Sequence, residues 1–315
     1  MKRRIVFMGT PDFAVGTLDA IVKAGYEVAA VVTVPDRQTG RGLKLTYSPV
    51  KEYALQHGLA LLQPEKLRDA AFVDELRAIG ADLFVVVAFR MLPQVVWSMP
   101  PLGTFNLHAS LLPQYRGAAP INWAIINGEK ETGVTTFLLN EKIDEGKVLM
   151  QRSTPISDAD TAESLHDRLA EMGAALTVET LDALFEGTVE PKAQEPCAVM
   201  KAAPKIFKQD CAIDWHRSGR YIFNFVRGLS PYPAATATMT DGKGAPVQMK
   251  IFAVEYVPSE GSIVGEIKSD RKKVLEIGVK DGFIKILNLQ ISGKKKISVE
   301  EFLRGYDVTN WKIGI

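Results

Sequence analysis

Two polar residues that could stabilise or move charge in a reaction lie two positions apart in one short stretch of the sequence. Asn106 and His108 fall at the end of a predicted strand over Thr104–Leu107, and the period-two geometry of a strand directs both side chains to the same side. The amide of Asn106 can donate a hydrogen bond to a developing oxyanion. The imidazole of His108 can donate one too, or transfer a proton near neutral pH. This spacing therefore indicates acid–base or carbonyl chemistry at the end of the strand.

The sequence contains no nucleophile motif beside Asn106 and His108, and it does not by itself identify a carboxylate that would act with them. Ser110 follows His108 by two residues but is not part of a GxSxG elbow, and neither a Walker A sequence nor HExxH occurs. Asp144 falls in a predicted loop after a strand over Gly133–Leu139, and loops at strand ends often carry function. A solvated turn residue explains Asp144 better when that residue is considered alone.

Alternating strands and helices in the first 185 or so residues would position these side chains. A strand, a helix and a second strand in close succession indicate a βαβ unit with a right-handed parallel crossover, and a continuous apolar run is typical of a fully buried parallel strand. The expected strands cover Ile5–Met8, Val28–Val34, Leu83–Val87, Thr104–Leu107 and Gly133–Leu139, and the expected helices cover Asp12–Ala24, Ala118–Ile126 and Thr161–Phe185, the last capped at Thr161. The pattern predicts an α/β domain with a Rossmann-like, mostly parallel sheet.

The first turn of this domain argues against a dinucleotide site. Gly9–Gly16 is not a GxGxxG sequence, and Pro11 removes an N–H that would bind a pyrophosphate. A nicotinamide-dependent dehydrogenase is therefore weakly supported.

The pattern changes after about residue 187. Three prolines punctuate an aperiodic stretch from Gly187 to Phe207, which indicates a linker, and a helix follows near Ser218–Gly228. Hairpin signals occur at Asp241–Gly244 and Asp281–Gly282. The apolar runs between such turns cover Val247–Val257, Val274–Val279 and Phe283–Leu289. A small, OB-like antiparallel β-barrel is the natural closure for such strands.

Charge is distributed unevenly over these expected parts, which are a domain over 1–187, a linker over 188–206 and a barrel over 207–315. The whole chain holds 38 Lys and Arg against 37 Asp and Glu, so its net charge is +1. Residues 1–204 contain 20 basic and 25 acidic residues, a net −5, whereas residues 205–315 contain 18 and 12, a net +6. A basic module on an acidic body suggests a polyanion partner, and uneven surface charge is the equally simple alternative.

Composition excludes several classes of protein. A chain with 46% hydrophobic and 24% charged residues is typical of a folded globular protein rather than a disordered one. Cys197 and Cys211 are the only cysteines, too few for a disulfide scaffold, and we expect unpaired thiols in a reducing cytosol. The N-terminal apolar run ends at Gly9, and no stretch approaches ~20 apolar residues. We therefore expect a cytoplasmic protein without a membrane segment and, because no amphipathic seam stands out, a monomer.

The polar stretch around His108 and several other segments of the chain together resemble the sequences of a known family. The chain is similar to the folate-dependent formyltransferases, and within them to the members whose acceptor is initiator tRNA. The similarity extends through the barrel and so covers essentially the whole chain. It is carried by Asn106–His108, Ser110–Gly117, Glu131–Thr135, the loop of Asp144, the opening Gly9–Ala14 and the basic insert Pro35–Leu45.

The resemblance implies an activity and a catalytic set. It implies transfer of the formyl group of 10-formyltetrahydrofolate to the α-amino group of methionine on initiator tRNA, without a metal. Asn106, His108 and Asp144 match the catalytic triad of the family. Asn106 and His108 would stabilise the oxyanion, and Asp144 would assist proton transfer.

The resemblance also implies two segments that bind the co-substrate. Ser110, Leu111, Leu112 and Pro113 match a folate-contacting segment. The loop Ala88–Leu92 matches the one that shapes the pterin pocket, with Phe89, Arg90, Met91 and Leu92 as its contacts. This loop departs from the pattern that we expect in many relatives, which is one residue longer and has Gly where Arg90 stands.

The tRNA partner is implied by a basic loop as well as by the barrel. Arg37, Arg41 and Lys44 lie in a Gly-punctuated segment that is expected to be exposed, and the family's insert is thought to grip the acceptor end. A plain solvated loop is the alternative.

Two other functions stay open. The first is a formyltransferase for a small amine, such as glycinamide ribonucleotide or an amino-sugar nucleotide, which would not need a basic barrel. The second is a non-catalytic RNA-binding protein, against which the intact set of Asn106, His108 and Asp144 argues.

Overall fold

The chain forms two compact units. The computed structural model describes residues 3–39, 44–195 and 199–314. Unit 1 comprises Met1–Gly117, Glu131–Thr154 and His166–Ala202, and unit 2 comprises Ala118–Lys130, Pro155–Leu165 and Ala203–Ile315. Neither unit is continuous in sequence, and the boundaries 1–187, 188–206 and 207–315 remain predictions.

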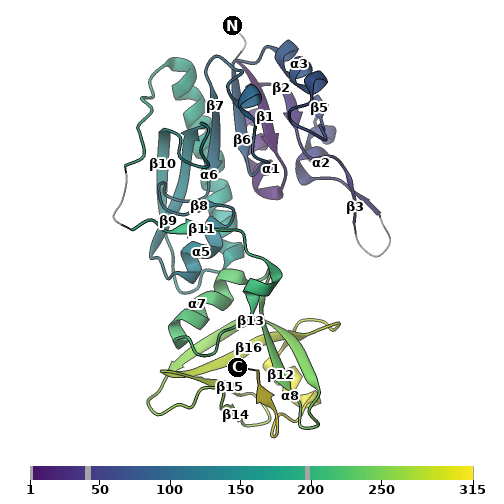
Figure 1. Cartoon of the computed structure of the whole chain (residues 1–315), viewed down its shortest axis with the longest axis vertical. Helices are drawn as coiled ribbons and strands as arrows, with labels where there is room; N and C mark the ends of the chain where they lie inside the picture. Colours follow the sequence, from purple (N-terminus) through teal and green to yellow (C-terminus); the bar gives the residue numbers. More distant parts are fainter. Residues whose placement is uncertain (1–2, 40–43, 196–198, 315) are drawn as a thin grey trace. The chain divides into compact units, whose positions relative to one another are not determined.

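Unit 1 is built on a seven-stranded sheet with the strand order β10-β9-β7-β6-β1-β2-β5 (Figure 1). Its strands β1, β2, β5, β6 and β7 pair in parallel, and β9 runs antiparallel to β7. The strands and helices of unit 1 are β1 (Arg4–Gly9), α1 (Asp12–Lys23), β2 (Glu27–Val32), β3 (Arg37–Thr39), β4 (Lys44–Thr46), α2 (Pro49–Gln56), β5 (Leu61–Leu62), α3 (Ala70–Ile79), β6 (Leu83–Val87), α4 (Gln94–Trp97), β7 (Thr104–His108), β8 (Arg116–Gly117) and β9 (Glu131–Leu138). Three elements cross the division between units, namely β10 (Val148–Pro155), α6 (Ala162–Glu186) and β11 (Ala202–Ala203).

The middle of this sheet is buried on both faces. All five residues of β6 are buried, and Ile5, Val6, Phe7 and Met8 of β1 have no exposed surface. Such strands read as continuous apolar runs because helices cover both faces of a parallel sheet. The predicted mostly parallel α/β sheet is therefore confirmed, with β6 at its predicted bounds.

The long helix α6 begins where its sequence predicts a cap. The backbone N–H of Ser164 donates to Oγ1 of Thr161 (3.2 Å), and the N–H of Thr161 donates to Oγ of Ser164 (3.0 Å). These bonds satisfy backbone donors that the first turn of a helix leaves unpaired.

Unit 2 contains a predominantly antiparallel sheet with the strand order β14-β15-β16-β13-β12-β18, and β17 pairs with β16. Its elements are α5 (Pro120–Ile126), the 3₁₀ helix η1 (Lys208–Cys211), α7 (Gly219–Leu229), β12 (Ala235–Thr240), β13 (Pro246–Pro258), β14 (Ile267–Ser269), β15 (Leu275–Val279), β16 (Gly282–Ile291), β17 (Ile297–Ser298), α8 (Val299–Gly305) and β18 (Lys312–Ile313). The long strands curl into a nearly closed barrel (Figure 1). The predicted barrel is confirmed.

Turn chemistry fixes the register of the barrel strands. In the turn from β12 to β13, the Asp241 carboxylate accepts from the N–H groups of Lys243 (2.9 Å) and Ala245 (2.8 Å). In the turn from β15 to β16, Val279 pairs with Gly282, whose φ is +152°. A Cβ at Gly282 would lie 2.1 Å from the carbonyl oxygen of Val257, so only glycine fits there. Both predicted hairpins are present.

Cys211 is a free, buried thiol whose pKa is raised by burial, and Cys197 lies outside the described residues. In the described ranges, no helix is long and apolar enough to cross a membrane.

Candidate active site

Asn106 and His108 lie on one strand at the centre of the candidate site. Strand β7 pairs in parallel with β6, where Asn106 faces Val86, and antiparallel with β9, where His108 faces Thr135. Two positions apart on one strand, their side chains share a face of the sheet, as the spacing predicts. His108 is only 7% exposed. Oδ1 of Asn106 is enclosed and accepts no hydrogen bond from the described residues.

One hydrogen bond decides which nitrogen of His108 is available. Nε2 lies 2.8 Å from the carbonyl oxygen of Tyr115, and a carbonyl oxygen only accepts, so Nε2 carries a proton and donates it. The remaining nitrogen, Nδ1, faces Oδ2 of Asp144 at 3.9 Å. That separation is too long for a hydrogen bond but allows strong electrostatic interaction with a protonated ring.

Asp144 reaches His108 through a loop that folds back over its own strand. Because β9 runs antiparallel to β7, it passes His108 at Thr135 and ends three residues beyond it, where Leu138 pairs with Phe105. The N–H of Leu138 donates to the carbonyl of Lys147 (2.9 Å). A Cβ at Gly146 would lie 1.6 Å from the carbonyl oxygen of Leu138, so this return requires glycine.

The carboxylate of Asp144 is held by a backbone donor. The N–H of Gly117 donates to Oδ2 (2.9 Å), and Asp144 itself has φ +53°, a left-handed conformation that costs free energy for a residue other than glycine. Asp144 lies in a loop, as predicted, and the structure brings it beside His108.

The segment of Ser110, Leu111, Leu112 and Pro113 forms a turn fixed to β9. Oγ of Ser110 donates to the carbonyl of Gln114 (2.6 Å). Oγ1 of the buried Thr135 donates to the carbonyl of Ser110 (2.6 Å) and accepts from the N–H of Leu112 (3.2 Å). These bonds order the backbone of the predicted folate-contacting segment.

The four residues predicted to shape the pterin pocket have different surroundings. Phe89 and Leu92 pack on a core cluster of unit 1, and Met91 is 72% exposed. The guanidinium of Arg90 donates to the carbonyls of Pro64 (2.9 Å) and Glu65 (3.1 Å), so it anchors the loop to the segment after β5.

Arg90 also contributes positive potential to this region. Burial, and then the nearby charge of Arg37, lower the pKa of its guanidinium, whereas the charge of Glu65 raises it. Arg37 is exposed in β3, which pairs antiparallel with β4 beginning at Lys44. Arg41 lies outside the described residues.

Several residues that hold the site are not predicted as site residues, because they act through the backbone or lie in the predicted linker. Tyr115 and Gly117 contribute a main-chain carbonyl and a main-chain N–H, so their side chains do not signal this role. Gln194 contacts the Asp144 loop, although its segment has no periodicity that would signal it. Within 3–39, 44–195 and 199–314, no three His, Cys, Asp or Glu side chains gather to hold a metal ion.

This arrangement suits the attack of an amine on a carbonyl carbon. It combines an amide with unmet hydrogen-bonding capacity, an imidazole with one available nitrogen and a carboxylate close to that nitrogen. Such groups can stabilise an oxyanion and accept a proton from the amine.

Comparison with known proteins gives the class. The formyl transferase family model matches residues 2–181, and the model of the formyl transferase C-terminal domain matches residues 205–307. The chain belongs to the formyl transferase family and is a formyltransferase enzyme, and the family uses formyl-tetrahydrofolate.

Two similar relatives carry the same name. The methionyl-tRNA formyltransferase of Bacteroides thetaiotaomicron is 54% identical over 311 residues, which cover 98% of this chain and 97% of the relative. That of Flavobacterium johnsoniae is 51% identical over 304 residues, which cover 96% of each chain.

Two solved structures with the same fold carry the names of different formyltransferases. WlaRD, a sugar 3N-formyl transferase, covers 94% of this chain and 100% of its own, with a TM-score of 0.65 and 20% identity. Glycinamide ribonucleotide transformylase 1 from Symbiobacterium toebii covers 60% of this chain and 93% of its own, with a TM-score of 0.51 and 22% identity. At these identities the likeness shows the fold alone.

The hydroxyl of Thr135 should be essential for the order of the turn after β7. We expect Thr135→Val to lower the free energy of unfolding by about 1–3 kcal/mol, because it leaves the buried N–H of Leu112 and carbonyl of Ser110 without that partner. Urea denaturation of the variant measures the loss.

Thr17→Val is the matched control, since its hydroxyl is also buried but has no partner among the described residues. The control should be neutral or stabilising, because it removes an unpaired polar group. Equal losses in the two variants would contradict the role of Thr135.

Proposed function

We propose that this formyltransferase transfers the formyl group of 10-formyltetrahydrofolate to the α-amino group of methionine on initiator tRNA, giving formylmethionyl-tRNA for translation initiation. The observation that carries the proposal is the grouping of Asn106, His108 and Asp144 at the end of β7, in a chain that matches methionyl-tRNA formyltransferases over nearly its full length. Membership of an enzyme family over both halves favours this function over a non-catalytic RNA-binding protein.

The residues fit a bound formyl donor. The enclosed Oδ1 of Asn106 accepts no hydrogen bond from the described chain, and because buried polar groups ordinarily find partners, it can accept one from a bound group. Donation to an oxyanion would come from the Nδ2 N–H groups of the same amide. The turn Ser110–Pro113 and the loop Phe89–Leu92 would hold the folate. When bound, that co-substrate supplies an activated formyl carbon.

The three side chains then have distinct tasks. The amide of Asn106 donates to the oxyanion that forms when the neutral amine attacks. His108, whose Nε2–H is engaged by Tyr115, donates through Nδ1–H in its protonated form, and the carboxylate of Asp144, 3.9 Å away, stabilises that charge. Asp144 also accepts a proton from the amine, directly or through water, and passes it to the departing folate nitrogen.

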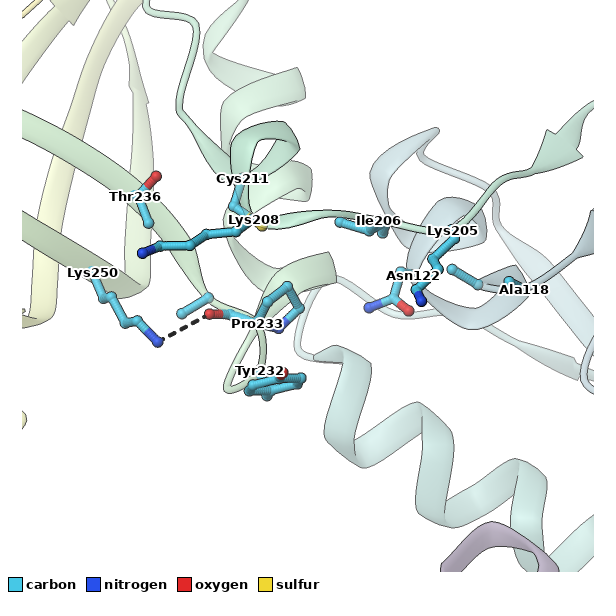
Figure 2. A pocket seen from close by; sticks show the side chains of 12 residues that line it. Ala118, Asn122, Lys205, Ile206, Lys208, Cys211, Tyr232, Pro233, Thr236 and Lys250 are labelled. Atoms are coloured by element: carbon cyan, nitrogen blue, oxygen red, sulfur yellow. Dashed lines mark hydrogen bonds between the residues drawn. The ribbon is translucent and has the colours of Figure 1, made fainter. Parts of the chain in front are cut away.

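A pocket in unit 2 supports an RNA contact. A cavity of about 430 Å³ is lined by Lys205, Lys208, Lys250 and Tyr232 among others, and the described lining residues include no carboxylate. In Figure 2 the side chains of Lys208 and Lys250 run in opposite directions, and Nζ of Lys250 donates to the carbonyl of Pro233 (3.3 Å). Tyr232 is 82% exposed, and positive grooves with accessible aromatic rings are typical of sites that bind single-stranded nucleic acid.

Further basic and aromatic groups belong to the proposed RNA surface. Phe207 is 50% exposed, and Nζ of Lys205 lies 5.4 Å from the centroid of its ring. In unit 1, Arg37, Arg41 and Lys44 of the β3–β4 segment would contact the acceptor end. We also propose a catalytic domain over 1–187, a linker over 188–206 and a tRNA-binding barrel over 207–315. We further propose that the protein acts as a cytoplasmic monomer.

Formyl transfer to charged tRNA is the direct test. We expect radiolabelled formyl from the folate donor to appear on methionyl-tRNA, and not on glycinamide ribonucleotide or an amino-sugar nucleotide. In single-turnover reactions, Asn106→Ala should slow transfer by about 10²–10³, the usual effect of losing one oxyanion donor, and His108→Ala and Asp144→Ala should also slow it. Near-wild-type rates in all three variants would refute the assigned site, and labelling of a small amine instead of the tRNA would refute the acceptor.

Binding of tRNA should weaken steeply with salt. Each phosphate contact lowers log K by about 0.7–0.9 per unit of log salt concentration, so Lys208→Ala and Lys250→Ala should each reduce the slope of the wild-type plot by about that amount. Filter binding over a salt series measures the slopes.

Lys23→Ala is the control, because Lys23 is an exposed lysine of α1 paired with Asp19, and its slope should match that of the wild type. Unchanged slopes for both pocket variants would exclude the pocket from the RNA interface.

A further inference from the structure

We infer that Gln194 is a positioning residue that holds Asp144 in its catalytic place; the inference rests on the proposed role of Asp144. Nε2 of Gln194 donates to the carbonyl of Asp144 (2.8 Å) and to the carbonyl of Gly146 (2.9 Å). One side-chain amide thus ties together the two ends of the sharp turn that presents the carboxylate.

The other side of the amide is fixed to the turn after β7. Oε1 of Gln194 accepts from Nε (3.2 Å) and Nη2 (2.6 Å) of Arg116. Nη1 of the same guanidinium lies 3.0 Å from Oε1 of Glu145. Gln194 and Arg116 therefore bridge the Asp144 loop and the segment that carries Tyr115 and Gly117, the backbone partners of His108 and Asp144.

A glutamine is chemically suited to this position because all its hydrogen-bonding capacity is used. Its two N–H donors meet two carbonyl acceptors, and its oxygen accepts two N–H groups. Glutamate would present an oxygen to the two carbonyls, and methionine would fill the space without any of the four bonds.

The loop needs such a restraint. Asp144 has φ +53°, and strained conformations of this kind persist only where their surroundings over-determine them. The loop also has to return over β9 to bring its carboxylate near His108, since that strand ends beside Phe105. Without Gln194, the hydrogen bond between Gly117 and Asp144 would have to hold this geometry with little help.

Backbone hydrogen bonds on both sides of Gln194 support this positioning role. Lys192 and Val148 exchange backbone hydrogen bonds of 2.7 and 2.9 Å, which aligns the chain beside the end of the Asp144 loop. Further on, the N–H of Tyr115 donates to the carbonyl of Lys201 (2.7 Å). The described parts of 192–201 thus form part of the structure that supports the catalytic groups in unit 1.

The test combines kinetics with a measurement that needs no substrate. Gln194→Met should lower kcat for formyl transfer by about 10², the usual cost of displacing a catalytic group by about 1 Å, with KM for both substrates unchanged. In an Asp144→Asn background it should cause almost no further loss, because it acts through that carboxylate. Gln194→Glu, which keeps the length and the pairing with Arg116, should behave in the same way.

Hydrogen exchange of the free enzyme gives the independent readout. The amide of Gly117 should exchange faster in Gln194→Met and Gln194→Glu than in the wild type, while the amides of β6 keep their protection and show that the fold is intact. Glu195→Gln, at an exposed neighbouring position, is the matched control and should leave kcat and the Gly117 amide unchanged.

The possible results distinguish failure of the positioning role of Gln194 from failure of the proposed role of Asp144. A wild-type kcat in Gln194→Met, an equal loss in the Asp144→Asn background, or an unchanged Gly117 amide would overturn the positioning role. A wild-type kcat for Asp144→Asn alone would overturn the proposed role of Asp144 and with it the catalytic part of the inference, whatever the exchange of Gly117 shows.

Discussion

The hydrogen bond from Nε2–H of His108 to the carbonyl of Tyr115 is the interaction on which the chemistry of the site depends. It assigns the proton to Nε2 and turns Nδ1 toward Asp144, so the imidazole has one working nitrogen and one that serves only to orient the ring. The carbonyl can do this because Tyr115 adopts φ +59° in a tight turn. The hydrogen bond from the N–H of Tyr115 to the carbonyl of Lys201 secures this turn. Orientation of the catalytic ring is therefore decided by main-chain geometry rather than by another side chain.

The carboxylate of Asp144 depends on its loop, because this loop begins at the end of β9 that lies away from His108. A parallel neighbour would have delivered a loop to the same edge as β7, but β9 is antiparallel and ends beside Phe105. Because Gly146 has no side chain, the loop can return close over β9. The side-chain amide of Gln194 then holds the loop in this position. The aperiodic segment after residue 187 is thereby more than a connection. It supplies contacts to both the histidine turn and the aspartate loop of unit 1.

The sequence was most informative where burial alone determines structure. The runs Leu83–Val87 and Ile5–Met8 predicted central strands because every residue in them must be apolar. Strand β12 was missed, although it alternates buried Ala or Met with more exposed Thr, because its small side chains produce no apolar run. Asn106 and His108 were predicted from spacing, but Gln194 could not be, since its function lies in contacts with backbone atoms far away in sequence. Asp144 was identified only through resemblance, as its position depends on a loop that no periodicity describes.

A buried cation ties the segment Pro155–Leu165 to the rest of unit 2. Arg227 of α7 is 7% exposed, and its Nη1 donates to the carbonyls of Ser157 (2.8 Å) and Asp160 (3.0 Å). Burial lowers the pKa of this guanidinium, whereas the charges of Asp158 and Asp160 raise it. A charge that is removed from water must be compensated, so the segment Pro155–Leu165 is required by α7 and belongs to the same unit.

Charge counted along the chain separates an acidic body from a basic end. In the folded unit 2, however, acidic residues of the first part neutralise a buried arginine of the second, and the lysines around Tyr232 stay without a carboxylate among the described residues that line their pocket.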